Sequence, residues 1–208
     1  MSWRDDSGMS LSELLVAASL LSVVLAAGWS IMYATSAMSN RLSASAVSTD
    51  ESQRFFDSVG TELRQANSLN SLAATQVAGS AAFITIQPRD MVFYANLYST
   101  AYIQKVEYVT SGVSLVRKEW KSTNTNYPYS WPSNPNTTTV EIQSIDPAWT
   151  SPIFTYYTDD NMPPSQTSQV ASVTAVAVQV QNLQMWGNQS ASYGASATVR
   201  VRAIDNKF

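Results

Sequence analysis

The sequence contains no cysteine and no histidine. The absence of cysteine excludes disulfides and thiolate nucleophiles, and the absence of both residues excludes Cys/His zinc sites and every catalytic triad that needs an imidazole base. Nothing in the spacing of the remaining carboxylates and of the Ser, Lys and Tyr residues indicates a catalytic site. We therefore expect a protein that is not an enzyme and that carries no cofactor and no metal.

Charged residues are also scarce. They make up 13% of the chain, against roughly 25% in an average soluble domain. The 12 Lys and Arg residues are scattered and the net charge is only -3, so the basic patch of a nucleic-acid-binding protein is missing. Arg200 and Arg202 could contact DNA, but two charges alone cannot supply useful phosphate affinity. DNA is thus a conceivable but unsupported partner, and part of the chain is expected to avoid water.

What the sequence does have is a long apolar run. Residues 14–33 carry no formal charge, and about 20 such residues in a helix span the bilayer core of about 30 Å. A secretory signal peptide would have a basic start and a shorter apolar stretch of about 7 to 15 residues. The run therefore predicts a transmembrane helix that stays attached to the chain.

One carboxylate, Glu13, stands at the head of this run. Inside hydrocarbon such a group costs roughly 2.5 to 3.5 kcal/mol, which makes it a functional candidate by default. The other interpretation is that Glu13 is a first-turn acid at the membrane interface, where the helix dipole favours it. From the residues themselves, both interpretations are open.

The residues around Glu13 carry a resemblance. Gly8 is followed by Met9, by Glu13 as the fifth residue after the glycine, and then by the apolar run; this start resembles the amino terminus of type IV prepilins. The resemblance implies that a prepilin peptidase cuts after Gly8 and methylates Met9 as the new terminus. It also implies that Glu13 neutralises the terminal amine of a neighbouring subunit when helices pack into a filament, where ammonium and carboxylate offset each other's desolvation.

The helical pattern continues beyond the apolar run but becomes amphipathic. Phe56, Val59, Leu63 and Ala66 are spaced by three or four residues and so share one face of a helix, whereas Glu62 and its charged neighbours lie mostly off that face. One helix from Met9 to about Ala66 would be roughly 85 Å long. The alternative is two helices that are broken in the Ser-rich stretch 43–52.

From residue 82 onward the periodicity changes to that of strands, with turn residues between them. The loop at residues 122–136 holds three prolines and no periodicity. The expected strands form an antiparallel sheet and lie at residues 83–86, 91–94, 105–109, 113–120, 138–142, 153–157, 173–180 and 195–203.

Three segments of this region are similar to parts of larger minor pilins and of J-type pseudopilins. In KVEYVTSGVSLVRKEW, a strand with a central Tyr108 turns at Ser111 and Gly112 and returns through Leu115 and Arg117. IFTYYTDDN resembles the aromatic strand and acidic turn of these proteins, and ATVRVRAIDN resembles their closing basic strand.

Two surface features are candidate sites. Tyr127, Tyr129 and Trp131 lie in the proline-rich loop, and exposed aromatic residues of this kind could anchor a partner; alternatively they fold back onto the sheet as a lid. Asp159, Asp160 and Asn161 could offer oxygen ligands to calcium, but their spacing fits no twelve-residue calcium loop.

These features predict an α+β, pilin-like chain in which a long amino-terminal transmembrane helix packs on a carboxyl-terminal antiparallel β-sheet head. The expected parts are a leader at residues 1–8, the membrane half of the helix at 9–33, its amphipathic half at 34–70 and the head at 71–208.

The resemblance implies a minor pilin or pseudopilin that primes or caps a type IV pilus or a type II secretion-like filament. Its partners would be other pilin-like subunits, the prepilin peptidase, the inner-membrane assembly platform and, before assembly, membrane lipid. It would cross the inner membrane once, with the head outside the cytoplasm, and then reach the pilus or pseudopilus at the cell surface. The alternative is a signal-anchored, adhesin-like surface protein that binds a ligand, with Glu13 incidental.

Overall fold

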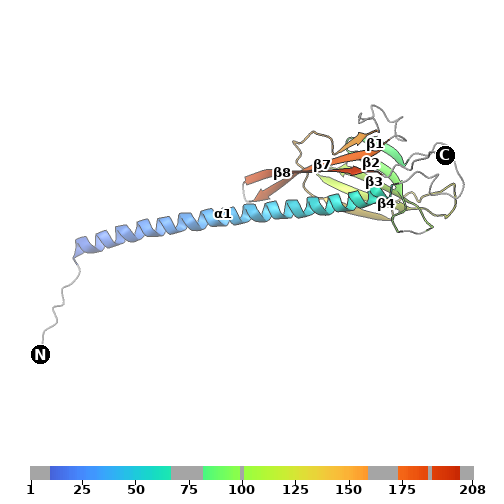
Figure 1. The fold of residues 1–208 in the computed structure, drawn as a ribbon. Coiled ribbons are helices and arrows are strands. Elements are labelled where there is room, and N and C mark those ends of the chain that lie inside the picture. Colours follow the sequence, from blue (N-terminus) through green and yellow to red (C-terminus); the bar gives the residue numbers. More distant parts are fainter. Residues whose placement is uncertain (1–9, 67–81, 99–100, 159–172, 187–188, 202–208) are drawn as a thin grey trace. The chain divides into compact units, whose positions relative to one another are not determined.

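The computed structural model describes residues 10–66, 82–98, 101–158, 173–186 and 189–201 (Figure 1). Within these ranges the chain forms one long helix, α1 (Leu11–Arg64), followed by eight strands. The chain divides into two compact units, Met1–Ala44 and Ser45–Phe208. The first unit holds the apolar part of α1, and the second holds the rest of α1 together with the strands. The predicted α+β layout is thereby confirmed.

The apolar part of α1 has the properties of a membrane segment. It is long and apolar enough to cross a bilayer, and none of its most apolar stretch is buried in the protein. Its serines do not interrupt it, because the hydroxyls of Ser19, Ser22 and Ser30 donate to carbonyls one turn back at 2.7 to 2.8 Å. The helix thus satisfies its polar side chains internally, as a lipid environment requires.

The Ser-rich stretch does not break the helix. Helical structure continues without interruption through residues 43–52, so α1 is one element and the two-helix alternative is wrong. Ser48 and Ser52 are buried, and the side-chain amide of Asn182 donates to the Ser52 hydroxyl at 3.2 Å. Small polar side chains at these positions therefore let a strand approach the helix closely.

In the second unit, α1 buries a stripe that is longer than the predicted one. Val59 and Leu63 are buried as expected, and so is Ala66, which lies just beyond the end of α1. Phe55, fully buried, takes the place predicted for Phe56, which is only partly buried. Glu62, expected mostly off the stripe, is also buried. The predicted stripe began too late, at Phe56, because the buried residues Ser48 and Ser52 are not apolar and so were not assigned to it.

The strands make two antiparallel sheets instead of the single sheet that was expected. The larger one is a meander in the order β1-β2-β3-β4-β5, and its hairpin between β3 and β4 turns at Gly112, whose φ of 61° favours glycine. Its strands are β1 (Phe83–Gln87), β2 (Asp90–Ala95), β3 (Gln104–Ser111), β4 (Ser114–Lys121) and β5 (Thr137–Ile142).

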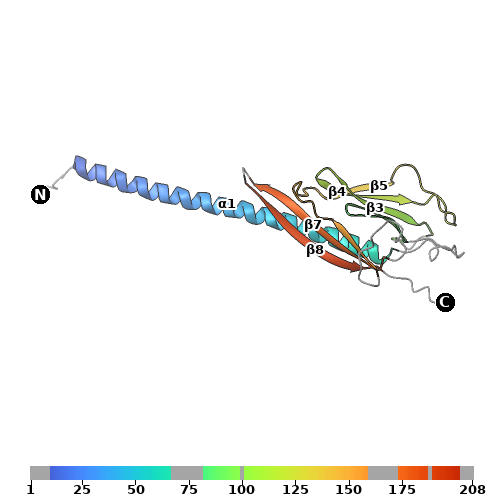
Figure 2. The same cartoon turned by 90° about the horizontal axis from the view of Figure 1, so that it is seen from above.

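The smaller sheet has the order β6-β7-β8, with β6 at Phe154–Tyr157, β7 at Ala175–Trp186 and β8 at Gln189–Arg200. β7 and β8 form a long hairpin (Figure 2), and each of its strands has 12 residues, about three or four more than predicted. The two sheets meet where the backbone amides of Ile153 and Phe154 donate to the carbonyl of Pro88 at 2.8 and 3.0 Å.

The core of the second unit centres on Tyr108. Its ring lies 5.9 Å from that of Phe55 on α1, 6.4 Å from that of Phe93 on β2 and 6.4 Å from that of Phe154 on β6. Aromatic pairs at such separations contribute about 0.5 to 1.5 kcal/mol each beyond the area that they bury. One side chain thus ties the helix to both sheets.

Candidate functional site

The first candidate site is the start of α1, where Glu13 takes part in a reciprocal cap. The backbone amide of Ser10 donates to Oε2 of Glu13 at 2.9 Å, and the amide of Glu13 donates to the Ser10 hydroxyl at 3.2 Å. This is the capping box, in which residues three apart satisfy two otherwise unpaired amides. Sequence reasoning missed it, although the Ser-x-x-Glu pattern at residues 10–13 is its usual signal.

The cap leaves part of the carboxylate available. Among the described residues, Oε1 of Glu13 accepts no hydrogen bond, and the side chain is exposed. From Leu14 to Asn40 no further charge follows. Glu13 can therefore cap its own helix with one oxygen and offer the other to a cation outside the chain. Gly8 and Met9, the predicted cleavage and methylation residues, lie outside the described residues.

The apolar residues that follow Glu13 are exposed in the described part of the first unit. Large side chains such as Leu14, Leu25 and Trp29 are all at least 60% exposed. A solvated surface of this kind is unfavourable by about 25 cal/mol per Å² of apolar area, so this part of α1 is suited to an apolar environment such as a bilayer.

A second cluster of charges lies inside the second unit and was not foreseen as a site. Arg117 of β4 donates to Glu62 of α1: its Nε lies 2.8 Å and its Nη2 2.6 Å from Oε1 of Glu62. The same Nη2 also donates to Oε2 of Glu119 at 2.8 Å. All three side chains are at most 11% exposed. The buried guanidinium is thus held between two buried carboxylates.

Two tyrosines complete this cluster. The Tyr108 hydroxyl donates to Oε2 of Glu62 at 2.7 Å, and the Tyr98 hydroxyl donates to Oε2 of Glu119 at 2.9 Å. Burial, followed by the charge of Glu62, raises the pKa of Tyr108 well above its usual value, so the phenol stays a donor. Desolvation disfavours the charge of Arg117, but hydrogen bonds with Glu62 and Glu119 outweigh it and raise the pKa of the guanidinium. Each charged side chain of the cluster has a partner of opposite charge, which suits a structural role.

The aromatic loop folds back onto the larger sheet. Trp131 stacks on Tyr94 of β2 with ring centroids 5.1 Å apart and planes 20° apart, and Tyr129 lies 6.3 Å from Trp131. Burial, followed by Tyr127, raises the pKa of Tyr94. Of the three aromatic residues of the loop, Tyr127 is 41% exposed and is the most open to a partner. This arrangement matches the lid interpretation.

If the loop is a lid, Trp131→Ala will lower the free energy of unfolding by about 1 to 2 kcal/mol, since an aromatic stack and its buried area are lost. The matched change Tyr127→Ala should cost less than about 0.5 kcal/mol, as expected of an exposed site. Urea unfolding followed by circular dichroism measures both. Equal losses in the two variants would contradict the lid.

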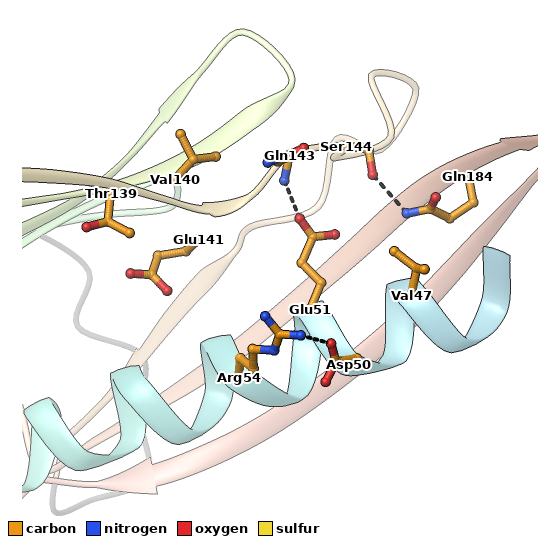
Figure 3. Close-up of a pocket in the computed structure, with 10 residues that line it drawn as sticks. All are labelled: Val47, Asp50, Glu51, Arg54, Thr139, Val140, Glu141, Gln143, Ser144 and Gln184. Carbon is orange, nitrogen blue, oxygen red and sulfur yellow. Dashed lines mark hydrogen bonds and ion pairs between the residues drawn. The ribbon is translucent and has the colours of Figure 1, made fainter. Parts of the chain in front are cut away.

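A groove of about 670 Å³ opens in the second unit beside β5 (Figure 3). Its walls are one flank of α1, the strand β5 with the residues that follow it, and one residue of β7. Among its lining residues, the backbone amide of Gln143 donates to Oε1 of Glu51 at 2.6 Å, and the side-chain amide of Gln184 donates to the Ser144 hydroxyl at 3.1 Å. No sequence pattern signals this groove, because its residues come from distant segments.

The remaining sites, considered but not favoured from the sequence, lie largely outside the described residues. Among the described residues, no group of three or more acidic, Cys or His side chains could hold a metal ion. The acidic residues considered for calcium, 159–161, lie outside the described residues, as does Arg202, while Arg200 is exposed at the end of β8.

Comparison with protein-family models and with curated proteins gave no match to this chain. The assignment of function therefore depends on the chain's own features.

Proposed function

We propose that the chain is a non-enzymatic assembly subunit, a minor pilin or pseudopilin, of a type IV filament system. The observation that carries the proposal is the single helix α1, Leu11–Arg64, which joins an exposed and uncharged apolar segment to the buried core of a β-rich unit. The carboxylate of Glu13 stands at the head of the apolar segment. An anchor alone needs about 20 residues, so a helix that continues into the core suits a subunit whose apolar half is transferred from lipid to a bundle.

In this proposal, prepilin peptidase removes residues 1–8 and methylates Met9. The apolar part of α1 then leaves the bilayer, through an assembly platform in the inner membrane, and packs against the helices of other pilin-like subunits. Because the lipid and the helix bundle both exclude water, moving the helix from one to the other gains little free energy from the hydrophobic effect. Association of the helices therefore depends on side-chain packing and on polar pairs. The second unit stays outside the cytoplasm and ends at the cell surface.

Glu13 would provide the polar pair. Its Oε2 caps the helix through the Ser10 amide, and this amide remains in the processed chain because Ser10 follows Met9. Its Oε1 would accept the terminal ammonium of a neighbouring subunit. In the apolar bundle each ion then offsets the desolvation of the other, and either one alone would cost several kcal/mol.

Intact mass spectrometry of the protein, purified from its native membrane, tests the proposal. We expect the mass of residues 9–208 with one added methyl group on Met9. A chain that still begins at Met1 has no free amine next to the helix, and this result would falsify processing and, with it, assembly through Glu13.

The second candidate is a signal-anchored surface protein whose second unit binds a ligand. The capping box favours it, because a local role for Glu13 makes a filament role unnecessary. This candidate predicts that the leader is retained and that Glu13 can be replaced by glutamine without consequence. Both results are the opposite of those expected for a filament subunit.

A further inference from the structure

The groove beside β5 lies along an open sheet edge. β5 (Thr137–Ile142) is the last strand of the larger sheet, and within the described part of the chain it pairs only with β4. The side chains of Thr137, Thr138, Thr139 and Val140 are exposed, Val140 by 48%. β5 contains no proline and no lysine, and its pairing with β4 is regular from Thr137 to Val140; the one register shift and the one charge of the strand both fall at Glu141. Its unpaired backbone groups are thus accessible to an additional strand.

The groove is negatively charged. Asp50 and Glu51 reach it from α1, and Glu141 reaches it from β5 (Figure 3). The cation among its lining residues, Arg54, is ion-paired with Asp50 one turn away. Three acids against one base leave a net charge of about -2 at neutral pH.

Glu141 is the least well compensated of these acids. It is half-buried, and among the described residues it has no hydrogen-bond or ion-pair partner within bonding distance. Burial raises its pKa, and the more distant Arg117 offsets this only in part. A cation placed in the groove would restore the interactions that this carboxylate loses by burial.

We propose that this groove docks an extended, basic segment of a partner protein, which adds to the larger sheet as a strand beside β5. The backbone of β5 supplies hydrogen bonds that any sequence can use, and Glu141, Glu51 and Asp50 select lysine or arginine side chains. The charge complementarity identifies the partner's chemistry, since an acidic or phosphorylated segment would be repelled. This inference goes beyond filament assembly and holds equally for a surface-anchored protein.

The test uses the full chain in detergent and two fluorescent ten-residue peptides. In one peptide lysine alternates with threonine or valine, and in the other glutamate replaces lysine. Fluorescence anisotropy should show saturable binding of the lysine peptide, weakened by salt, and no binding of the glutamate peptide. Hydrogen exchange should slow at residues 137–142 when the lysine peptide is present.

Three variants separate docking in the groove from general attraction to an acidic protein. Thr139→Lys places a cation on the groove wall, Glu141→Gln removes an anion, and Thr198→Lys adds a charge on the exposed face of β8. Each variant makes the net charge more positive by one. We expect at least tenfold weaker binding for Thr139→Lys, about threefold to tenfold weaker binding for Glu141→Gln, and unchanged binding for Thr198→Lys.

Equal effects in the three variants, or equal binding of the two peptides, would overturn the proposal. So would protection of residues 137–142 that rises with protein concentration when no peptide is present, because the occupant would then be a second copy of the chain. Near-ultraviolet circular dichroism checks that each variant is folded. Since Glu141→Gln conserves shape, a loss of binding by this folded variant cannot be attributed to the backbone of β5.

Discussion

Replacing Arg117 with methionine is expected to lower the free energy of unfolding of the second unit by about 3 to 5 kcal/mol. Arg117 is the cation between Glu62 and Glu119, and all three side chains are at most 11% exposed. Methionine fills a similar volume, so the cost comes from electrostatics instead of a cavity. The variant leaves two carboxylates buried with only the hydroxyls of Tyr108 and Tyr98 to compensate them. Such a loss is a large part of the roughly 5 to 15 kcal/mol that stabilises a typical domain.

The matched control is Arg54→Met on the exposed flank of α1. Arg54 is ion-paired with Asp50, but the two side chains are 78% and 57% exposed, and exposed pairs one helical turn apart contribute only about 0.3 to 0.5 kcal/mol. Urea unfolding in detergent, followed by tryptophan fluorescence, measures both variants. If Arg117→Met lost less than about 1 kcal/mol more than the control, the buried cluster would not stabilise the contact of α1 with β4.

The periodicity of the sequence predicted the elements well where side chains alternate in polarity. β2, β3 and β4 lie within about two residues of the expected ranges, because apolar residues such as Phe93, Val106 and Leu115 recur along them and turn residues separate them. The end of α1 was also close to the prediction, since Val59, Leu63 and Ala66 mark the buried stripe. Elements with a strongly amphipathic pattern can thus be located without knowledge of their partners.

The extent of the β7 and β8 hairpin was underestimated for a related reason. The predicted strands covered residues 173–180 and 195–203, whereas β7 continues to Trp186 and β8 begins at Gln189. The missed residues are mostly polar or small and have no clear apolar alternation. Their pairing is set by the regular register with the opposite strand, which is a property of two segments and not of one.

The buried charge cluster could not be found by the same reasoning. A glutamate on an amphipathic helix is usually assigned to the wet face, because burial of a charge is unfavourable unless a partner is present. The partner of Glu62 is Arg117, which is 55 residues away in the sequence. The contact depends on how α1 and β4 are packed, and periodicity contains no information about that packing. For the same reason the groove beside β5 was unforeseen.

Glu13→Gln is expected to reduce incorporation of the protein into filaments by about 100-fold, while insertion into the membrane and removal of residues 1–8 continue normally. Glutamine is a good substitute for glutamate in a capping box, so it retains the contact with the Ser10 amide. It removes the charge, however, and in the proposed filament it would leave the ammonium of the neighbouring subunit unpaired in an apolar bundle. About 3 kcal/mol lost from such a pair corresponds to somewhat more than a hundredfold in the association constant.

The reverse change is Ser10→Ala, which removes the hydroxyl that caps the Glu13 amide but leaves the carboxylate charged. Loss of a cap costs about 1 kcal/mol of helix stability. A helix that is surrounded by lipid or by other helices should tolerate this loss, so incorporation of Ser10→Ala into filaments should fall by less than tenfold. Quantitative immunoblots of sheared filaments and of membranes, in cells that express the native filament system, measure both variants. Normal incorporation of Glu13→Gln together with a defect in Ser10→Ala would assign Glu13 to the helix cap alone, and the proposed pair with a neighbouring amine would then be wrong.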